Sequence, residues 1–267
     1  MMSVRMQASQ PTIAPTVPAG RDASLQRLVE ELYAGQQAIE PDNPYLREHG
    51  SPIWIANQIR NFHWYRPFLP DTGAVLDWGC HHAVDSCLLR AWFGDRLSLH
   101  SCDVLEPGRY PVFHDFARAA YTRLEDAVRL PFPSNSFDAV IGSGVLEHVA
   151  MDYESLKELH RVLRPDGMLL ISYLPNWLSY EEWVQRTIRK SAFHRRLYGL
   201  GEAKQLLKRC GFYPVLAGYH TFFWKRLVRA AGLRRWERPL SALLERLLPV
   251  QVISSTLRVV ARKMTEM

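Results

Sequence analysis

The sequence predicts an α/β fold, in which helices cover both faces of a doubly wound and mostly parallel sheet. Two observations predict it. Short apolar runs that end in an acid or a glycine alternate with segments of helical periodicity along much of the chain. The first run, residues 74–77, ends at Asp77 and is followed by a turn at Gly79 and a helical pattern over residues 84–92. Such a strand, turn and helix place a ligand crevice at the carboxyl end of the strand.

The composition is that of an ordinary globular protein. The chain has 267 residues, of which 47% are hydrophobic and 22% are charged. No apolar run reaches the roughly 18 residues that span a bilayer. The N-terminus also lacks the charged start and apolar core of a signal peptide. We therefore expect a cytoplasmic protein with one large domain.

The cysteines predict no metal site. None of the four forms a CxxC pair, so a zinc site is not expected. The four cysteines are better explained as free thiols that pack in the core than as metal ligands. Free thiols in a chain of this length also suggest a reducing compartment. The four residues are Cys80, Cys87, Cys102 and Cys210.

The part before the first strand divides into a tail and a helical region. Residues 1–21 are rich in Ser, Thr, Pro, Ala and Gln without periodicity, and we expect them to be disordered. Residues 22–70 contain two stretches of helical spacing, and Asn43-Pro44 between them predicts a turn or a helix cap. Packing against the sheet would by itself explain these helices.

The remaining segments supply more strands and helices. Residues 97–103 alternate and end in Asp103, an acid at the tip of the second strand, where such folds bind ribose hydroxyls. A solvated loop acid is the alternative. Further strands are predicted at 139–143, at 168–172, through Val215 and at 256–262, and further helices at 155–163 and 201–210. The breakers Arg164-Pro165-Asp166-Gly167 predict a turn.

The loop after the first strand resembles motif I of class I S-adenosylmethionine-dependent methyltransferases. In that motif an acid is followed by three glycines at alternate positions. Asp77 and Gly79 match, whereas His81 and Ala83 stand where the second and third glycines are expected. The resemblance implies that Asp77, Gly79 and Cys80 contact S-adenosylmethionine. The two substituted positions leave open how closely the methionine part of the cofactor approaches the loop.

A second stretch, residues 124–141, resembles the methyltransferase type 11 group, which includes the methyltransferases of ubiquinone and menaquinone biosynthesis. An Asp-Ala pair precedes Leu-Pro-Phe, and a Ser-Phe-Asp turn leads into the fourth strand. The resemblance implies that Asp126 accepts a hydrogen bond from the adenine amino group. It also implies that the backbone N–H of Ala127 meets a ring nitrogen.

The end of the fourth strand carries the candidate catalytic residues. Ser143 and Gly144 lead into Leu146-Glu147-His148, which the resemblance places beside the transferred methyl group. His148 is a candidate general base near neutral pH, and a structural histidine at a helix start is the alternative. His194, Glu147 and Tyr198 are the other candidate bases. Relatives that bind a divalent cation have an acid where this chain has Gly144, so we expect no metal.

The resemblance covers residues 75–172 with four motifs in the family's order. It implies a Rossmann-like, seven-stranded sheet whose last strand is antiparallel. The domain would occupy residues 71–267, with insertions at 175–200 and 221–250, and residues 22–70 would form a lid over the cofactor.

The expected function is methyl transfer from S-adenosylmethionine to a small-molecule, glycan or lipid-linked acceptor. We favour O-methylation, with a carbon nucleophile as the alternative. A relative that keeps the fold without turnover is a further alternative, motivated by His81 and Ala83. The Asn/Asp-Pro-Pro-aromatic motif of base-amine methyltransferases is missing after the fourth strand, so we expect no nucleic-acid substrate.

The charge distribution is uneven. Residues 186–250 carry a net charge of +12, and the rest of the chain carries −6. A solvated basic face explains this pattern. An anionic acceptor or peripheral contact with a membrane surface is the alternative.

Overall fold

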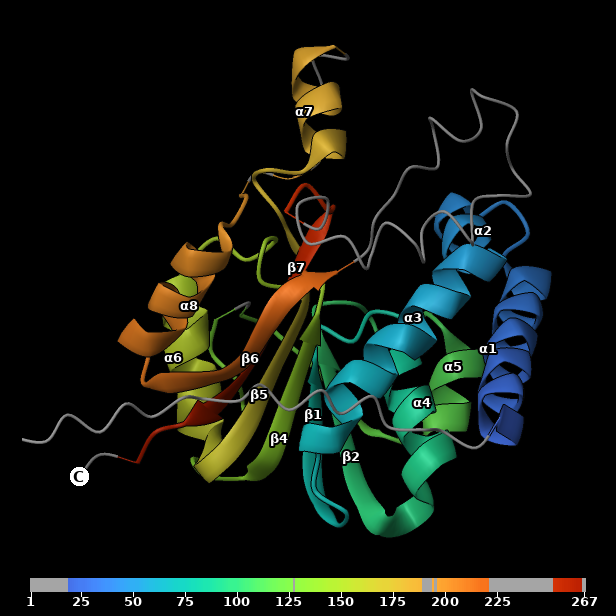
Figure 1. Cartoon of the computed structure of the whole chain (residues 1–267). Helices are drawn as coiled ribbons and strands as arrows, with labels where there is room; N and C mark the ends of the chain where they lie inside the picture. The colour runs from blue at the N-terminus through green and yellow to red at the C-terminus, as the bar shows by residue number, and fades with distance from the viewer. Residues whose placement is uncertain (1–18, 127, 189–193, 195, 221–251, 266–267) are drawn as a thin grey trace, which may run out of the picture.

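A seven-stranded sheet forms the centre of the molecule. The computed structural model describes residues 19–126, 128–188, 194, 196–220 and 252–265. The strands lie in the order β3-β2-β1-β4-β5-β7-β6, and β7 runs antiparallel to both of its neighbours while the other pairs are parallel (Figure 1). The strands are β1 Gly73–Trp78, β2 Leu97–Asp103, β3 Ala120–Arg123, β4 Phe137–Ser143, β5 Leu163–Pro175, β6 Phe212–His220 and β7 Thr256–Lys263. The predicted fold class, including the antiparallel last strand, is confirmed.

Helices cover both faces of this sheet. In Figure 1, α1, α3, α4 and α5 lie on one side and α6 and α8 on the other, while α7 projects away from the sheet. The helices are α1 Ala19–Ile39, α2 Pro44–His49, α3 Pro52–Tyr65, α4 Val84–Phe93, α5 Pro111–Ala117, α6 Asp152–Val162, α7 Tyr180–Thr187 and α8 Leu200–Arg209. None of the helices in the described ranges combines the length and the apolar character needed to cross a membrane.

The central strands are apolar on both faces because both faces are covered. Val75 and Leu76 are neighbours in β1 and both are fully buried, but their side chains belong to different hydrophobic clusters. Val75 packs with α1, α3, α4 and α5, and Leu76 packs with α6 and α8. Since side chains alternate along a strand, a continuous apolar run is the pattern expected of a buried parallel strand.

The sheet reverses its winding between β1 and β4. The chain continues from β1 to β2 on one side, whereas β4 pairs with the other side of β1. At such a point the connections leave in opposite directions and open a crevice beyond the carboxyl ends of the strands. Asp77 and Ser143, near the carboxyl ends of β1 and β4, lie at this crevice.

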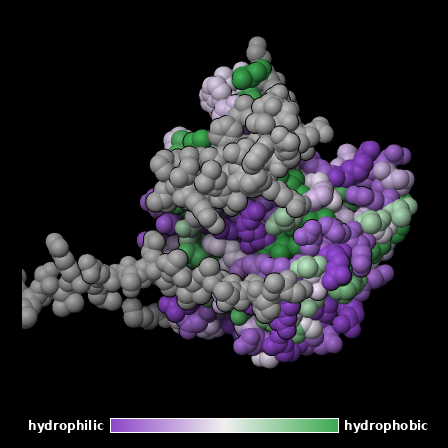
Figure 2. Space-filling view, turned by 45° about the vertical axis from the view of Figure 1, so that its right-hand side comes forward, coloured by the Kyte–Doolittle hydropathy of each residue, from purple (hydrophilic) through white to green (hydrophobic). Residues whose placement is uncertain are grey.

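The N-terminal helices pack on the α4 and α5 side. Helix α1 begins at Ala19, inside the range predicted as a disordered tail, and the other residues of that tail lie outside the described ranges. The side chain of Asn43 accepts hydrogen bonds from the N–H groups of Tyr45 and Leu46 and caps α2, which confirms the predicted helix cap. The surface turned forward in Figure 2 carries mainly hydrophilic residues, with hydrophobic ones scattered among them.

One local prediction is wrong. The predicted turn at residues 164–167 is part of β5, which begins directly after α6 at Leu163. The pairing register with β4 shifts there, and Asp166 has a φ of +61°, so the breakers form an irregularity within the strand. Arg164 is also tied to β4 by an ion pair with Asp138, at 2.6 Å. The predicted insertion at 221–250 lies outside the described residues.

Candidate functional site

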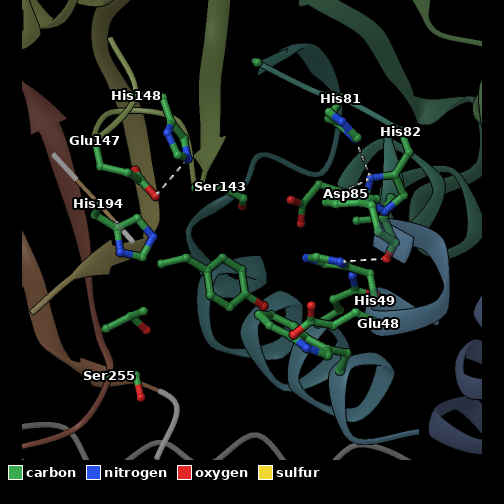
Figure 3. Close-up of a pocket in the computed structure, with 18 of the residues that line it drawn as sticks. Glu48, His49, His81, His82, Asp85, Ser143, Glu147, His148, His194 and Ser255 are labelled. Atoms are coloured by element: carbon green, nitrogen blue, oxygen red, sulfur yellow. Dashed lines mark hydrogen bonds and ion pairs between the residues drawn. The ribbon is translucent and has the colours of Figure 1, made fainter. Parts of the chain in front are cut away.

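A cavity of about 550 Å³ opens at the carboxyl ends of β1 and β4 (Figure 3). Its size is in the range of small-molecule sites. It brings together most of the predicted site residues, namely Asp77, Gly79, Cys80, Ser143, Gly144, His148 and His194. Glu147, which the sequence places beside His148 in the same motif, also lies in this wall. Residues that the sequence did not predict complete it, namely Tyr45, Glu48, His49, Trp54, Gln58, His81, His82, Val84, Asp85, Tyr173, Ser179, Glu181, Glu182, Ser255 and Thr256.

The loop after β1 has the backbone shape of a glycine-rich turn although two of its glycines are replaced. Gly79, His81 and Ala83 have φ values of +66°, +48° and +59°. A non-glycine residue in this left-handed region costs roughly 1–2 kcal/mol. The surrounding hydrogen bonds hold the conformation: the N–H of Ala83 donates to the carbonyl of Cys80 at 2.6 Å, and the N–H of Gly79 donates to that of Cys102 at 2.8 Å.

Asp103 supports this loop from the neighbouring strand. Its Oδ2 accepts from the backbone N–H of His81 at 2.8 Å, and its Oδ1 accepts from Leu105 at 3.1 Å. The side chain is 8% exposed and is not among the residues that form the cavity wall. Contact of Asp103 with ribose hydroxyls therefore stays a prediction. In the structure, the same carboxylate accepts hydrogen bonds that hold the backbone at His81 and Leu105 in place.

We expect Asp103→Ala to lower the affinity for S-adenosylhomocysteine by about ten- to a hundredfold, because a charged acceptor of the loop amide is lost. Isothermal titration measures the change. Asp115→Ala is the matched control, since Asp115 is exposed on α5. An unchanged affinity in Asp103→Ala would show that the loop keeps its shape without this carboxylate.

Asp77 and Asp85 form a buried pair of acids beside the cavity. Asp77 accepts from the hydroxyl of Ser86 at 2.7 Å and from its N–H at 3.2 Å, and Asp85 accepts from the hydroxyl of Tyr65 at 2.6 Å. Burial and the neighbouring Asp85 raise the pKa of Asp77 to about 8, and burial raises the pKa of Asp85. The pair therefore holds a proton at neutral pH, which a bound cation would displace.

The N-terminal helices contribute a row of rings to the cavity. His49 stacks on Tyr45 with ring centroids 3.8 Å apart and on Trp54 at 4.7 Å, and the ring of His81 lies 4.4 Å from that of Tyr45. Helical spacing predicted the helices, but it carried no signal for these rings, because their role depends on how α2 and α3 dock against the loop after β1.

His82, in the loop after β1, connects Tyr45 of this row to Tyr33 of α1 through hydrogen bonds. It is 4% exposed, and burial holds its pKa well below the usual value, so the ring is neutral. Gln58 donates to the Tyr33 hydroxyl at 2.8 Å, which leaves that hydroxyl to donate to Nε2 of His82 at 2.7 Å. Nδ1–H of His82 then donates to the hydroxyl of Tyr45 at 3.2 Å. This chain of hydrogen bonds fixes the position of Tyr45 at the cavity wall.

The opposite side of the cavity holds the two histidines among the candidate bases (Figure 3). Nδ1 of His194 lies 2.6 Å from the carboxylate of Glu182, which also accepts from Arg186 at 3.2 Å. His148 is exposed, and its Nε2 lies 3.8 Å from Oε1 of Glu147. Burial, and secondarily the nearby His194, lowers the pKa of His148.

Of the two predicted adenine contacts, Asp126 is not among the described residues of the cavity wall. Asp126 is fully exposed and accepts from the N–H groups of Val128 and Arg129 at 2.7 and 3.2 Å, which lower its pKa. Ala127 lies outside the described residues. Their contact with adenine stays a prediction that rests on the motif.

Tyr173 is a site residue that the sequence did not predict. It has a φ of +62°, and the pairing of β5 with β7 shifts register between Ile171 and Leu174. A bulge of this kind redirects a side chain, and a strained residue at a cavity indicates a functional position.

Within the described ranges, no three His, Cys, Asp or Glu side chains are arranged to hold a metal ion.

Comparison with known proteins gives partial matches. Residues 76–171 match the family described as a methyltransferase domain. A probable S-adenosylmethionine-dependent methyltransferase of Mycolicibacterium smegmatis is 33% identical over 99 residues, which cover 36% of this chain and 37% of the relative. The demethylmenaquinone methyltransferase of Mycobacterium tuberculosis is 41% identical over 73 residues, covering 25% of this chain and 31% of the relative. The chain thus spans about a third of the length of these relatives.

Solved structures share the fold at low identity. A Haemonchus contortus phosphoethanolamine N-methyltransferase 2 superposes with a TM-score of 0.53 at 19% identity, covering 78% of this chain and 53% of that one. The [4+2]-cyclase SpnF superposes with a TM-score of 0.56 at 17% identity, covering 80% and 83%. Likeness at this level shows the fold alone.

Proposed function

We propose, from the premise that residues 76–171 form an S-adenosylmethionine-dependent methyltransferase domain, that this chain transfers a methyl group to a small-molecule acceptor. The family match and the curated relatives confirm the resemblance predicted from the sequence. One observation carries the proposal: the loop after β1 keeps a left-handed backbone at all three glycine positions of motif I. Retention of that shape favours cofactor binding over loss of the site.

The residues at the crevice fit S-adenosylmethionine. The loop with Gly79 and Cys80 would lie against its methionine part, and the buried pair Asp77 and Asp85 would receive its ammonium group. When bound, the cofactor supplies a methyl group on a sulfonium that a nucleophile displaces in line. The protein aligns the nucleophile and keeps water away from it.

His194 is the base that the geometry supports best for a hydroxyl acceptor. Glu182 accepts from its Nδ1–H, which assigns the basic nitrogen of the neutral ring to Nε2. That nitrogen would take the proton of the acceptor hydroxyl as its oxygen attacks the methyl group, and the thioether of the cofactor would be the leaving group. His148, more exposed and without such a carboxylate partner at hydrogen-bond distance, is the second candidate. A carbon nucleophile stays the alternative.

The charges of the cavity bear on the choice of acceptor. Among the described residues of its wall there are acids and histidines but no lysine or arginine. An anionic acceptor would therefore find no cation in this part of the wall. Contact of the basic region 186–250 with an anionic partner or a membrane stays a separate proposal, because most of that region lies outside the described residues.

Titration of S-adenosylmethionine against pH tests cofactor binding. Below pH 8, binding of the ammonium group releases the proton that Asp77 holds, so the affinity should rise with pH by up to about tenfold per unit. Above pH 8 the ligand's own α-amino group loses its proton, and the affinity should fall. Asp77→Asn should remove the rising limb. No binding at any pH, with the protein shown to be folded, would contradict the proposed function.

A further inference from the structure

Glu147 differs from every other acid of the cavity wall. It is 6% exposed, and its Oε2 is buried without a hydrogen-bond partner among the described residues. The nearest ion-pair contact that the structure gives it is Nε2 of His148 at 3.8 Å, and burial lowers the pKa of that histidine. Burial raises the pKa of Glu147 to about 8, so the carboxyl group keeps its proton until a ligand supplies a positive charge that stabilises the carboxylate.

Of the other acids of the wall, Glu48 is exposed to solvent, and the remaining four have partners among the described residues. Glu182 lies against His194 and Arg186, and Glu181 accepts from the hydroxyl of Ser255 at 2.9 Å. Asp77 and Asp85 accept from Ser86 and Tyr65, and the ammonium group of the cofactor accounts for their charge. Among the buried acids of the described wall, Glu147 is the one whose Oε2 is left without a partner.

Two aromatic residues, Tyr173 and Trp54, share the cavity wall with this carboxyl. A Cβ placed on Gly144 would lie 3.8 Å from Oε1 of Glu147 and 4.0 Å from the Cβ of Tyr173, so both side chains flank the same glycine. The ring of Tyr173 lies 6.3 Å from that of Trp54, and both line the cavity. Aromatic faces attract a cation through their ring quadrupoles.

We propose that the methyl acceptor carries a positively charged nitrogen, which Glu147 receives as a carboxylate beside Tyr173 and Trp54. This inference rests on the proposed function and deepens it, because it names the substrate class as small ammonium compounds such as amino alcohols. The nitrogen is the group that the protein recognises, and the nucleophile is the hydroxyl that faces His194. A cation in this place supplies the charge that the protein lacks around Glu147.

The first test compares two ligands of the same shape. Choline and 3,3-dimethylbutan-1-ol share size and hydroxyl position, but only choline is charged. With the wild-type protein saturated with S-adenosylhomocysteine, we expect calorimetry to give at least about tenfold tighter binding of choline. Equal affinities would overturn the inference, and this comparison does not depend on the folding of any variant.

The second test removes the charge of Glu147. Glu147→Gln should lower the affinity for choline to that for its uncharged isostere and leave the affinity for S-adenosylhomocysteine within about twofold. Glu154→Gln, at an exposed position of α6, should change neither affinity. A melting curve checks that each variant is folded.

The outcomes separate the inference from the proposed function. Weaker binding of S-adenosylmethionine but not of S-adenosylhomocysteine in Glu147→Gln would show that the carboxylate faces the sulfonium, which overturns the inference alone. Failure of the wild-type protein to bind either cofactor form would overturn the proposed function. Loss of choline binding in Glu48→Gln, an exposed acid of the same cavity, with Glu147→Gln unaffected would assign the cation to the other wall and also overturn the inference.

Discussion

Replacement of His194 by alanine lowers kcat by about two to four orders of magnitude, if this histidine is the general base. The affinity for S-adenosylmethionine should stay within about twofold, because Asp77 and Asp85, the acids proposed to receive its ammonium group, lie on the other side of the cavity. Single-turnover formation of S-adenosylhomocysteine measures the first quantity, and calorimetry measures the second.

His148→Ala is the matched control for this prediction, since both histidines line the same wall with ring centroids 6.1 Å apart. A large loss in His148→Ala with little change in His194→Ala would assign the base to His148 instead. Glu182 acts through His194 and is a positioning residue. Glu182→Gln should therefore lower kcat by about tenfold and leave KM and the melting temperature nearly unchanged.

Replacement of Gly79 by alanine has the second large effect, on both stability and cofactor binding. An added Cβ would lie 2.6 Å from both methyl groups of Val145, and the φ of +66° is unfavourable for any side chain. The backbone term amounts to roughly 1–2 kcal/mol and the overpacking to roughly 1–3 kcal/mol. We expect the free energy of unfolding, measured with denaturant, to fall by about 2–5 kcal/mol, and cofactor binding to fall below detection.

Gly108 provides the control for a substitution at positive φ without a clash. Its φ is +82°, but an added Cβ meets no atom within 4 Å, and it lies outside the cavity wall. Gly108→Ala should therefore lose only the backbone contribution and keep its cofactor affinity. Gly79→Ala combined with Val145→Ala removes the clash and should recover part of the lost stability. No recovery would show that the backbone conformation alone accounts for the loss.

Features that depend on local sequence were predictable. The apolar run before Asp77 and the turn at Gly79 set the end of β1, because alternation and turn chemistry act over a few residues. The same holds for the acid at the end of β2 and for the cap of α2 at Asn43. Ser143 and Gly144, which were predicted to contact the cofactor because they follow directly from a strand end, therefore lie in the cavity wall.

Features that depend on tertiary contacts were not predictable in the same way. Glu182 orients His194 only because the chain returns to the cavity after α7, and the sequence shows no pattern for that return. The side chain of Tyr173 depends on a shift of strand pairing that periodicity does not reveal. Asp126 carries a family motif, yet here its carboxylate turns to the amides of its own loop.

The cavity wall combines residues from inside and outside the region that matches the methyltransferase domain. Tyr45, His49 and Trp54 come from α2 and α3, which precede that region, whereas the loop at Gly79 and Glu147 lie inside it. Under the proposed function, residues of α2 and α3 are free to diverge without any change in the loop that would hold the cofactor, while Glu147 would diverge only together with the matched region. A chimera that exchanges α2 and α3 between related chains should therefore change the affinity for parts of the acceptor other than its charged nitrogen and keep the preference for a cation.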